Sequence, residues 1–278
     1  GKGFKGAVGT GASYTRLMGL ARFDPFEKRL EELLGIPFYP VTTQVYPRSQ
    51  EYRLLNTLAE IGAALNKFAF DLRLLQSPLS GELSESFGKN QVGSSAMPFK
   101  KNPIQAEKID SLARQLAQYP RIAWDNAAFS ALERTLDDSA NRRSYLPEAF
   151  LLTDEILLVG HRLVKNLVVD QAASQTTLNT YAPFSAIEPL LMELVKAGAN
   201  RQEMHDRLRK HALVVKASTQ GEVKDTLLQE LSSDPEITRY LSVQQLTDQM
   251  DISNYLGIAP QRAREMVRMV HEAVGVGL

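Results

Sequence analysis

The sequence predicts an all-α fold, a bundle of long helices followed by a smaller all-helical domain. Apolar residues recur at alternating spacings of four and three from residue 54 to 75 and again from 145 to 163, as in helices that pack along one another. After residue 169 the helix starts lie closer together, and each has a capping signal of its own. We therefore assign residues 1–180 to a bundle domain and residues 181–278 to a helical cap domain.

The N-terminal segment is rich in glycine, at positions 1, 3, 6, 9 and 11. Its spacing fits neither of the two common nucleotide-loop fingerprints, so a tight structural turn is the simpler interpretation. A short helix is predicted over 24–34, with Asp24 as its N-cap and Gly35 ending it. Residues 36–46, with Pro37 and Pro40 inside them and Pro47 next to them, are predicted to form an extended connector that carries Gln44.

One long helix is predicted from Ser49 to Leu75. A helix of about 25 residues is about 38 Å long at about 1.5 Å per residue, too long to be buried by a small domain alone. Its stripe consists of Leu54, Leu58, Ile61, Leu65, Phe68, Leu72 and Leu75. Further stripes are formed by Tyr145, Ala149, Leu152, Ile156, Val159 and Leu163, and by Ile109, Leu112, Leu116 and Tyr119. Such faces are core or subunit interface and favour self-association.

The run Gly93–Pro103 joins a Gly/Ser-rich half to a half with two lysines and an asparagine. Asn102 is a good N-cap, Pro103 a good first helical residue and Gln105 a good capping-box partner. The unpaired N–H groups of that helix start, with Lys100 beside them, would form a site for an anionic oxygen. Serine beside such a site suggests proton abstraction next to a carboxylate. On composition alone, an ordinary connector before a capped helix is the stronger interpretation.

The run matches G-S-S-x-M-P-x-K-x-N-P at every specified position, and so resembles the signature loop, here within residues 89–103, of the fumarase/aspartase superfamily. The segments Lys5–Ser13 and Glu133–Arg143 resemble those of the adenylosuccinate lyase family in particular, and the similarity includes Thr42–Gln44 and Ala182–Phe184. Without it, Glu133–Arg143 would read as a solvated turn. The resemblance implies a long-helix bundle of the fumarase/aspartase type. It also implies a homotetramer with active sites shared between subunits.

The resemblance also implies an activity, the elimination of fumarate from adenylosuccinate and from a related succinyl nucleotide of purine biosynthesis, without metal or organic cofactor. The residues implied for catalysis are Ser94, Ser95, Lys100 and Glu107. Those implied for substrate binding are Gln44, Met97, Asn102, Arg134, Ser139 and Arg143. Ser94 corresponds to the proposed base, with Ser95 as the second candidate, and Lys100 and Asn102 to groups that hold the succinyl carboxylates. Glu107 corresponds to a carboxylate that orients an acid histidine. Arg134, Ser139 and Arg143 correspond to contacts with the nucleotide and its phosphate.

That acid histidine is not identifiable here. None of the four histidines, at 161, 205, 211 and 271, lies in a segment that matches the family's histidine motifs. The chain begins with a glycine inside a family-like segment, so we expect an N-terminal part to be missing. Whether this chain alone folds or is active is left open.

The composition of the chain argues against several other classes of function. Lysine plus arginine and aspartate plus glutamate number 32 each, so no overall charge draws the chain to nucleic acid or to a membrane surface. Cysteine is absent, which excludes disulfides and thiolate metal sites and fits a reducing compartment. No apolar run is long enough to span a bilayer, and no signal peptide opens the chain. We expect a cytoplasmic protein that binds a small nucleotide.

Two alternatives stay open from the sequence. One is another lyase of the superfamily, of the argininosuccinate lyase or carboxymuconate cycloisomerase type, against which the segments around Gly6 and Ser139 argue. The other is a non-catalytic helical oligomerisation fragment, since the expected histidines are not found.

Overall fold

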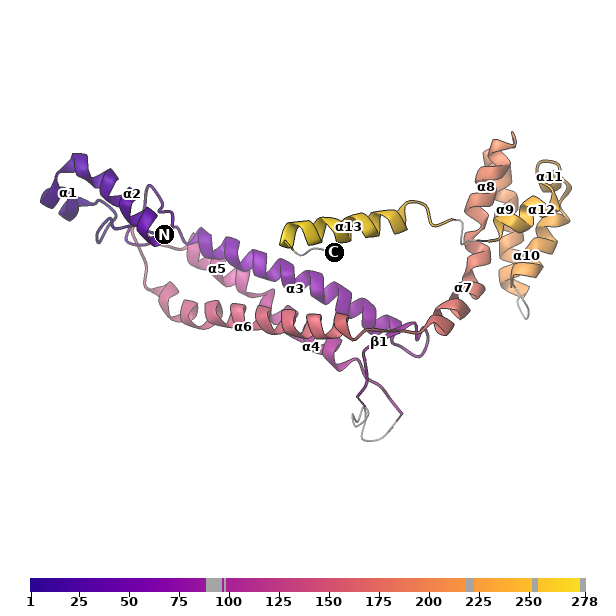
Figure 1. Ribbon diagram of the computed structural model, residues 1–278, viewed down its shortest axis with the longest axis horizontal. Helices are drawn as coiled ribbons and strands as arrows, with labels where there is room; N and C mark the ends of the chain where they lie inside the picture. The colour runs from indigo at the N-terminus through magenta and orange to yellow at the C-terminus, as the bar shows by residue number, and fades with distance from the viewer. Residues whose placement is uncertain (89–96, 98, 219–222, 252–254, 276–278) are drawn as a thin grey trace. The chain divides into compact units, whose positions relative to one another are not determined.

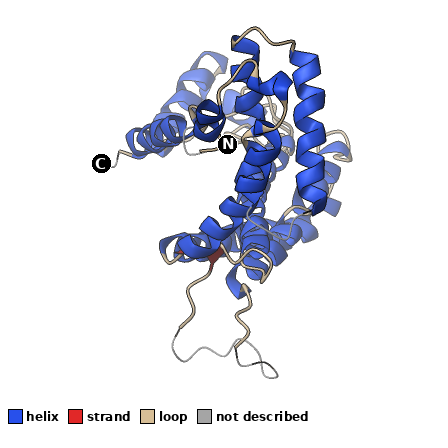
Figure 2. Cartoon of the chain, turned by 90° about the vertical axis from the view of Figure 1, so that its right-hand side faces the viewer, coloured by secondary structure: helices blue, strands red, loops and turns tan. Residues whose placement is uncertain are grey.

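The computed structural model describes residues 1–88, 97, 99–218, 223–251 and 255–275. Tertiary contacts divide the chain into two units, Gly1–Asp170 and Gln171–Leu278, and each has a hydrophobic core of its own. Almost all regular structure is helical (Figure 2), which confirms the predicted all-α class. The boundary predicted at residue 180 lies inside a helix that begins at Gln171.

The first unit contains two short N-terminal helices, the long bundle helices and one small strand pair. Its elements are α1 (Ala12–Met18), η1 (Leu20–Arg22), α2 (Phe23–Leu34), α3 (Ser49–Leu75), β1 (Leu83–Ser84), α4 (Ile104–Leu116), α5 (Tyr119–Ala128), α6 (Asp137–Lys165) and β2 (Val168–Val169). Helix α3 has the predicted bounds. Gly35 ends α2 in the left-handed conformation as predicted, but α2 begins at Phe23, so Asp24 lies in its first turn and is not its N-cap.

The core of this unit lies between α3, α4, α5 and α6, with α3 and α6 lying alongside each other (Figure 1). Every residue of the stripe predicted on α6 is buried, and Ile109 and Leu116 of the α4 stripe are fully buried. Both stripes are confirmed. Since helices this long bury one another along their length, the ends of the bundle lie far apart.

The stripe predicted on α3 is confirmed at Leu58 and Leu72 but wrong at its start. Leu54 is 38% exposed, whereas Leu55 is fully buried. The buried face runs through Gly62 and Ala69, which a pattern of large apolar residues does not include. A Cβ atom at Gly62 would lie 3.1 Å from the Leu116 side chain of α4, so the helices approach closest where α3 has no side chain.

The glycine-rich N-terminus forms a structural turn, as the simpler interpretation predicted. Gly9 has a φ of 83°, and a Cβ there would lie 2.0 Å from the carbonyl oxygen of Thr42. Only glycine allows this approach. The turn therefore lies directly against the connector that carries Gln44.

Strands β1 and β2 form an antiparallel pair, with Leu83 opposite Val169 and Ser84 opposite Val168. The Asp170 N–H also donates to the carbonyl of Glu82 at 2.9 Å. This pair ties the chain that follows α3 to the end of α6.

The second unit is a cluster of shorter helices. Its elements are α7 (Gln171–Ser185), α8 (Ile187–Lys196), α9 (Arg201–Ser218), α10 (Val223–Ser232), α11 (Pro235–Thr238), α12 (Val243–Gln249) and α13 (Ala259–Val274). Predicted starts are confirmed where the caps are local. Asn200 accepts the N–H of Glu203, Asp234 accepts that of Glu236, and Ser242 forms a full capping box. No helix in the described ranges is long and apolar enough to cross a membrane.

A buried polar network joins the starts of α3 and α6. The Arg142 guanidinium donates to both carboxylate oxygens of Glu51, with Nε at 2.9 and 2.8 Å. Tyr46 donates to the same carboxylate at 2.5 Å and Tyr145 at 3.0 Å. Arg48 lies 3.3 Å from it. Four side chains thus surround one carboxylate that is 3% exposed.

The hydrogen bonds decide the charge state of Glu51. Burial alone raises its pKa, but the bonds from Arg142, Tyr46 and Tyr145 outweigh burial, and the pKa of Glu51 is lowered. Burial raises the pKa of Tyr145 to about 12, so this hydroxyl stays a donor. A lowered native pKa stabilises the fold above the ordinary glutamate pKa, and this stabilisation is lost as the pH falls through the native value.

Adjacent arginines test this network. Arg142→Gln should destabilise the first unit by about 3–5 kcal/mol, because it leaves a buried carboxylate without its main partner. Arg143→Gln should change stability by less than about 0.5 kcal/mol, since Arg143 is exposed and, among the described residues, its side chain bonds to Ser139 alone. Urea unfolding followed by Trp124 fluorescence measures both, as Trp124 is the single tryptophan. Equal effects of the two substitutions would contradict the network.

A substitution at Asp234 tests how this carboxylate stabilises the second unit. Burial raises its pKa, but the bonds from His211, the Glu236 amide and Arg207 together lower it. Asp234→Ala should therefore destabilise the unit by about 2 kcal/mol at neutral pH. The difference from wild type should vanish as the pH falls below about 4, through the native pKa of Asp234. Hydrogen exchange of the α9 and α10 amides measures it, with Asp248→Ala as the control, and a loss independent of pH would contradict the assignment.

Candidate functional site

The signature segment lies at the base of α4, and only part of it falls within the described residues. Ser94 and Ser95, the predicted base and its second candidate, lie outside them. Met97 and Lys100 are exposed, and the Lys100 N–H donates to the Met97 carbonyl at 2.9 Å. Asn102 is half-buried just before α4. Lys100, Asn102 and Glu107 therefore lie within one short stretch, as the sequence required.

The anion site predicted at the start of α4 is already occupied, which corrects the sequence interpretation. Pro103 stands at the N-cap position, and no side chain of Asn102 or Gln105 caps the helix. Instead the Glu85 carboxylate accepts the N–H of Gln105 at 3.1 Å and that of Ala106 at 2.7 Å. A residue 20 positions away in sequence does what the local pattern assigned to Asn102. A substrate anion cannot use the same two N–H groups.

Glu85 is 7% exposed and has no ion pair among the described residues. Burial raises its pKa, the amides of Ala106 and Gln105 lower it, and the charge of Glu107 raises it again, so that the net shift is upward. Glu107 itself is exposed in the first turn of α4. No local sequence pattern singles out Glu85, because the amides that it binds lie 20 and 21 positions further along the chain.

The second group of predicted residues lies at the start of α6. Ser139 accepts a hydrogen bond from Arg143 at 3.4 Å. Arg134 is half-buried, and its Nε has no hydrogen-bond partner among the described residues. Leu132, just before it, has a φ of 41°, a conformation that costs a non-glycine residue energy and that concentrates at functional turns. Unused guanidinium donors at a constrained turn suit a phosphate.

The buried network orients this second group. Arg142 and Asp138 point inward to Glu51 and Arg48, so the neighbouring side chains of Ser139 and Arg143 leave the helix in other directions. Gln44 is exposed on the connector whose Tyr46 and Arg48 belong to the same network. Sequence analysis missed these inward residues, because a buried ion pair between residues 51 and 142 has no local signature.

The two groups are far apart within one chain. Arg142 contacts the start of α3, whereas the start of α4 lines a hollow shared with Arg162, near the other end of α6. The stretch of α6 between these arginines is about 30 Å long at about 1.5 Å per residue. Figure 1 shows both ends of this bundle. One small substrate cannot contact both groups of the same chain.

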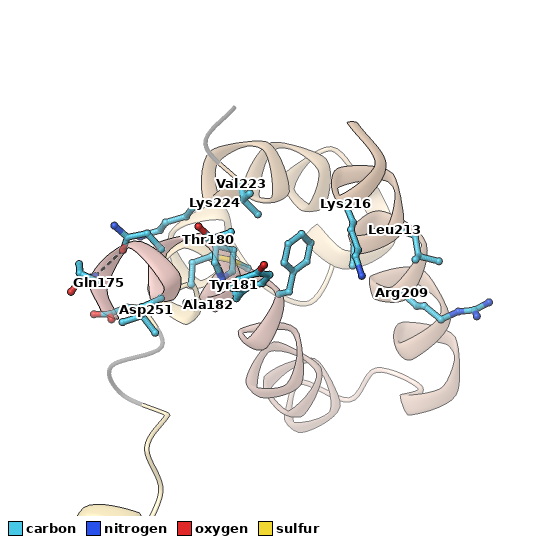
Figure 3. A pocket seen from close by; sticks show the side chains of 16 residues that line it. Gln175, Thr180, Tyr181, Ala182, Arg209, Leu213, Lys216, Val223, Lys224 and Asp251 are labelled. Atoms are coloured by element: carbon cyan, nitrogen blue, oxygen red, sulfur yellow. Dashed lines mark hydrogen bonds between the residues drawn. The ribbon is translucent and has the colours of Figure 1, made fainter. Parts of the chain in front are cut away.

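A larger hollow, of about 1150 Å³, lies within the second unit. Figure 3 shows Thr180, Tyr181 and Ala182 of α7 on one side and Arg209, Leu213 and Lys216 of α9 on another. It contains none of the predicted site residues. Its size alone does not make it the reactive centre.

Comparison with known families supports the sequence resemblance. Residues 4–117 match the family model described as "Lyase", and residues 183–266 match "Adenylosuccinate lyase C-terminus". The two matches lie in different units of the structure. Both halves of the chain thus point to the same group of proteins.

Curated relatives are named adenylosuccinate lyase. That of Schizosaccharomyces pombe is 35% identical over 271 residues, which is 96% of this chain and 55% of the relative. That of Schistosoma mansoni is 40% identical over 241 residues, 84% of this chain and 49% of the relative. That of Pyrococcus abyssi is 35% identical, over 99% of this chain and 58% of the relative. The chain therefore spans about half the length of the curated relatives it matches.

Solved structures show the same fold. A 3-carboxy-cis,cis-muconate lactonizing enzyme from Pseudomonas putida matches with a TM-score of 0.74 at 22% identity, covering 92% of this chain and 55% of that one. A fumarate lyase from Mesorhizobium matches with a TM-score of 0.75 at 23% identity, over 92% and 54% of the two chains. With the two family models and the curated relatives in agreement, this chain is similar to adenylosuccinate lyases over almost its whole length.

Proposed function

We propose that the protein containing this chain is an adenylosuccinate lyase. It eliminates fumarate from adenylosuccinate to give AMP, and from the succinyl-aminoimidazole-carboxamide ribonucleotide of purine biosynthesis. The observation that carries this proposal is the match to curated adenylosuccinate lyases over 96% of the chain, because it spans both groups of predicted site residues.

The proposed reaction removes a proton from the carbon next to a succinyl carboxylate. The proton passes to Ser94, with Ser95 as the alternative base, and the C–H electron pair becomes the new C=C bond. The C–N pair leaves with the nitrogen, which a general acid protonates. Charge accumulates on the carboxylate in the intermediate, and Lys100 and Asn102 stabilise it there. Serine is a weak base at its usual pKa, so the positive charge of Lys100 also favours its alkoxide.

The residues near the start of α6 bind the nucleotide part of the substrate. Arg134, Ser139 and Arg143 hold the nucleotide and its phosphate, with Gln44 and Met97 as further contacts. A guanidinium presents paired donors to a phosphate, and the buried Nε of Arg134 has no hydrogen-bond partner among the described residues. Glu107 orients the acid, which is not among the residues assigned in this chain.

The distance between the signature segment and the start of α6 implies that copies of the chain assemble to complete each active site. Since one chain holds them about 30 Å apart along α6, each active site takes the signature segment from one copy and the α6 start from another. Helices α3 and α6 also carry large exposed apolar residues, including Phe70, Leu74, Phe150 and Leu151, which other copies would cover. We propose a cytoplasmic homotetramer.

Two adjacent lysines test the carboxylate role. In protein expressed from the complete coding sequence, Lys100→Ala should lower kcat/KM for fumarate release by about 100-fold or more, because it removes a cation from the developing charge. Lys101→Ala should leave it near wild type, since the Lys101 side chain lies over the Phe87 ring, 5.9 Å from its centre. Argininosuccinate serves as the control substrate. Release from argininosuccinate alone would reject the substrate assignment.

A mixing experiment tests the shared site. Lys100→Ala and Arg143→Ala protein should each be inactive, and a mixture dissociated and reassembled in equal amounts should recover activity. About a quarter of the sites then hold both intact side chains, because each comes from a different copy. Lys100→Ala mixed with Asn102→Ala should not recover, since those side chains lie on one segment. Equal recovery in both mixtures, or in neither, would argue against sites shared in this way.

A further inference from the structure

Glu85 and Gln76 hold the two ends of the signature segment together. Gln76 follows the last turn of α3. Its side-chain oxygen accepts the N–H of Glu85 at 2.9 Å, and its side-chain nitrogen donates to the carbonyl of Lys101 at 3.0 Å. The Glu85 carboxylate then binds the first-turn amides of α4. We call these four hydrogen bonds the clasp.

The clasp is anchored to rigid elements on three sides. Gln76 extends from α3, the amides belong to α4, and Glu85 directly follows β1, which pairs with β2 at the end of α6. Lys100 directly precedes the clasp bond at Lys101, and Asn102 lies between that bond and the start of α4. Their backbone positions are therefore set from outside the signature segment.

The charge of Glu85 is costly to the fold. Its carboxylate is nine-tenths buried, lacks an ion pair among the described residues and lies near the like charge of Glu107. Burial raises its pKa above the ordinary glutamate value, which means that folding disfavours the ionised form. A neutral isostere would bury the same volume at lower cost. A costly charge retained at such a point is typical of residues that serve function at the expense of stability.

We propose that Glu85 and Gln76 are positioning residues for the fumarate-releasing reaction: the clasp fixes the start of α4 and thereby places Lys100 and Asn102 for the carboxylate they stabilise. This inference rests on the proposed function. Neither side chain touches substrate. The Glu85 carboxylate satisfies the first-turn amides of α4 that would otherwise attract a substrate anion.

Chemical rescue tests the clasp. Glu85→Ala should expose the amides of Gln105 and Ala106, raising their hydrogen exchange at least about tenfold. It should lower kcat about 10- to 100-fold, because small displacements of catalytic groups cost that much, while KM changes less than about threefold. Formate should restore both protection and kcat, since a hollow of about 250 Å³ adjoins Glu85. Glu82→Ala is the matched control, a nearby glutamate whose carboxylate bonds to Ser80.

Two further variants separate positioning from simple stability. Glu85→Gln should leave the midpoint of thermal unfolding unchanged or raise it, yet lower kcat, because a neutral amide oxygen is a weaker acceptor for the two N–H groups. Gln76→Met removes both bonds of the Gln76 side chain, from the Glu85 N–H and to the Lys101 carbonyl, while the Glu85 carboxylate stays in place. It should lower kcat without response to formate. It keeps the test decisive if Glu85→Ala does not fold.

The outcomes are distinct. The proposal is supported if formate lowers the exchange rate and raises kcat of Glu85→Ala to their wild-type values. Faster exchange in Glu85→Ala with unchanged kcat, or loss of kcat only in step with loss of stability across the variants, overturns it. Wild-type protein that releases no fumarate from adenylosuccinate would reject the proposed function, and with it any catalytic role of the clasp, while the exchange result still reports the clasp itself.

Discussion

The long helices of the first unit each begin with N–H groups that no helical carbonyl can accept, and a buried carboxylate lies at each of these starts. Glu51 lies in the first turn of α3, Asp138 in that of α6, and Glu85 binds the first turn of α4 from another segment. Negative charge is favourable at the positive end of a helix dipole. These three carboxylates are between 2% and 7% exposed. The arrangement of the bundle ends depends on them, and both groups of predicted site residues lie at those ends.

The carboxylates differ in what they contribute. The Glu51 carboxylate accepts hydrogen bonds from an arginine and two tyrosine hydroxyls, which lower its pKa. Its ionised form therefore stabilises the contact between α3 and α6. Glu85 receives only amides among the described residues, and its pKa rises. The first is a structural joint that fixes the direction of Ser139 and Arg143. The second holds an unfavourable charge beside the signature segment, which fits a role in placing reactive groups.

This chemistry also limits how substrate anions are held. Because Glu85 already binds the first-turn amides of α4, the succinyl carboxylates of the proposed substrate would depend on side chains such as Lys100. At the other end of the bundle, the Arg134 Nε without a hydrogen-bond partner in the described part of the chain offers a donor to a phosphate. The length of α6 separates these donors within one chain. The shared sites that we propose between copies follow from helix length as much as from any family likeness.

The sequence by itself determined what depends on near neighbours along the chain. The heptad spacing predicted the bundle and the bounds of α3, and the caps at Asn200, Asp234 and Ser242 predicted helix starts of the second unit. These succeed because a helical repeat and a cap are formed by residues within a few positions of each other.

Tertiary structure alone decided the contacts made across long separations. The close approach at Gly62 shifted the buried face of α3, since a missing side chain matters only when another helix lies against it. The partner of the α4 amides is Glu85 and not Asn102, and Glu51 bonds to Arg142, which lies 91 positions away in the sequence. No local pattern encodes such pairs, because their energy comes from burial that exists only once the helices have packed.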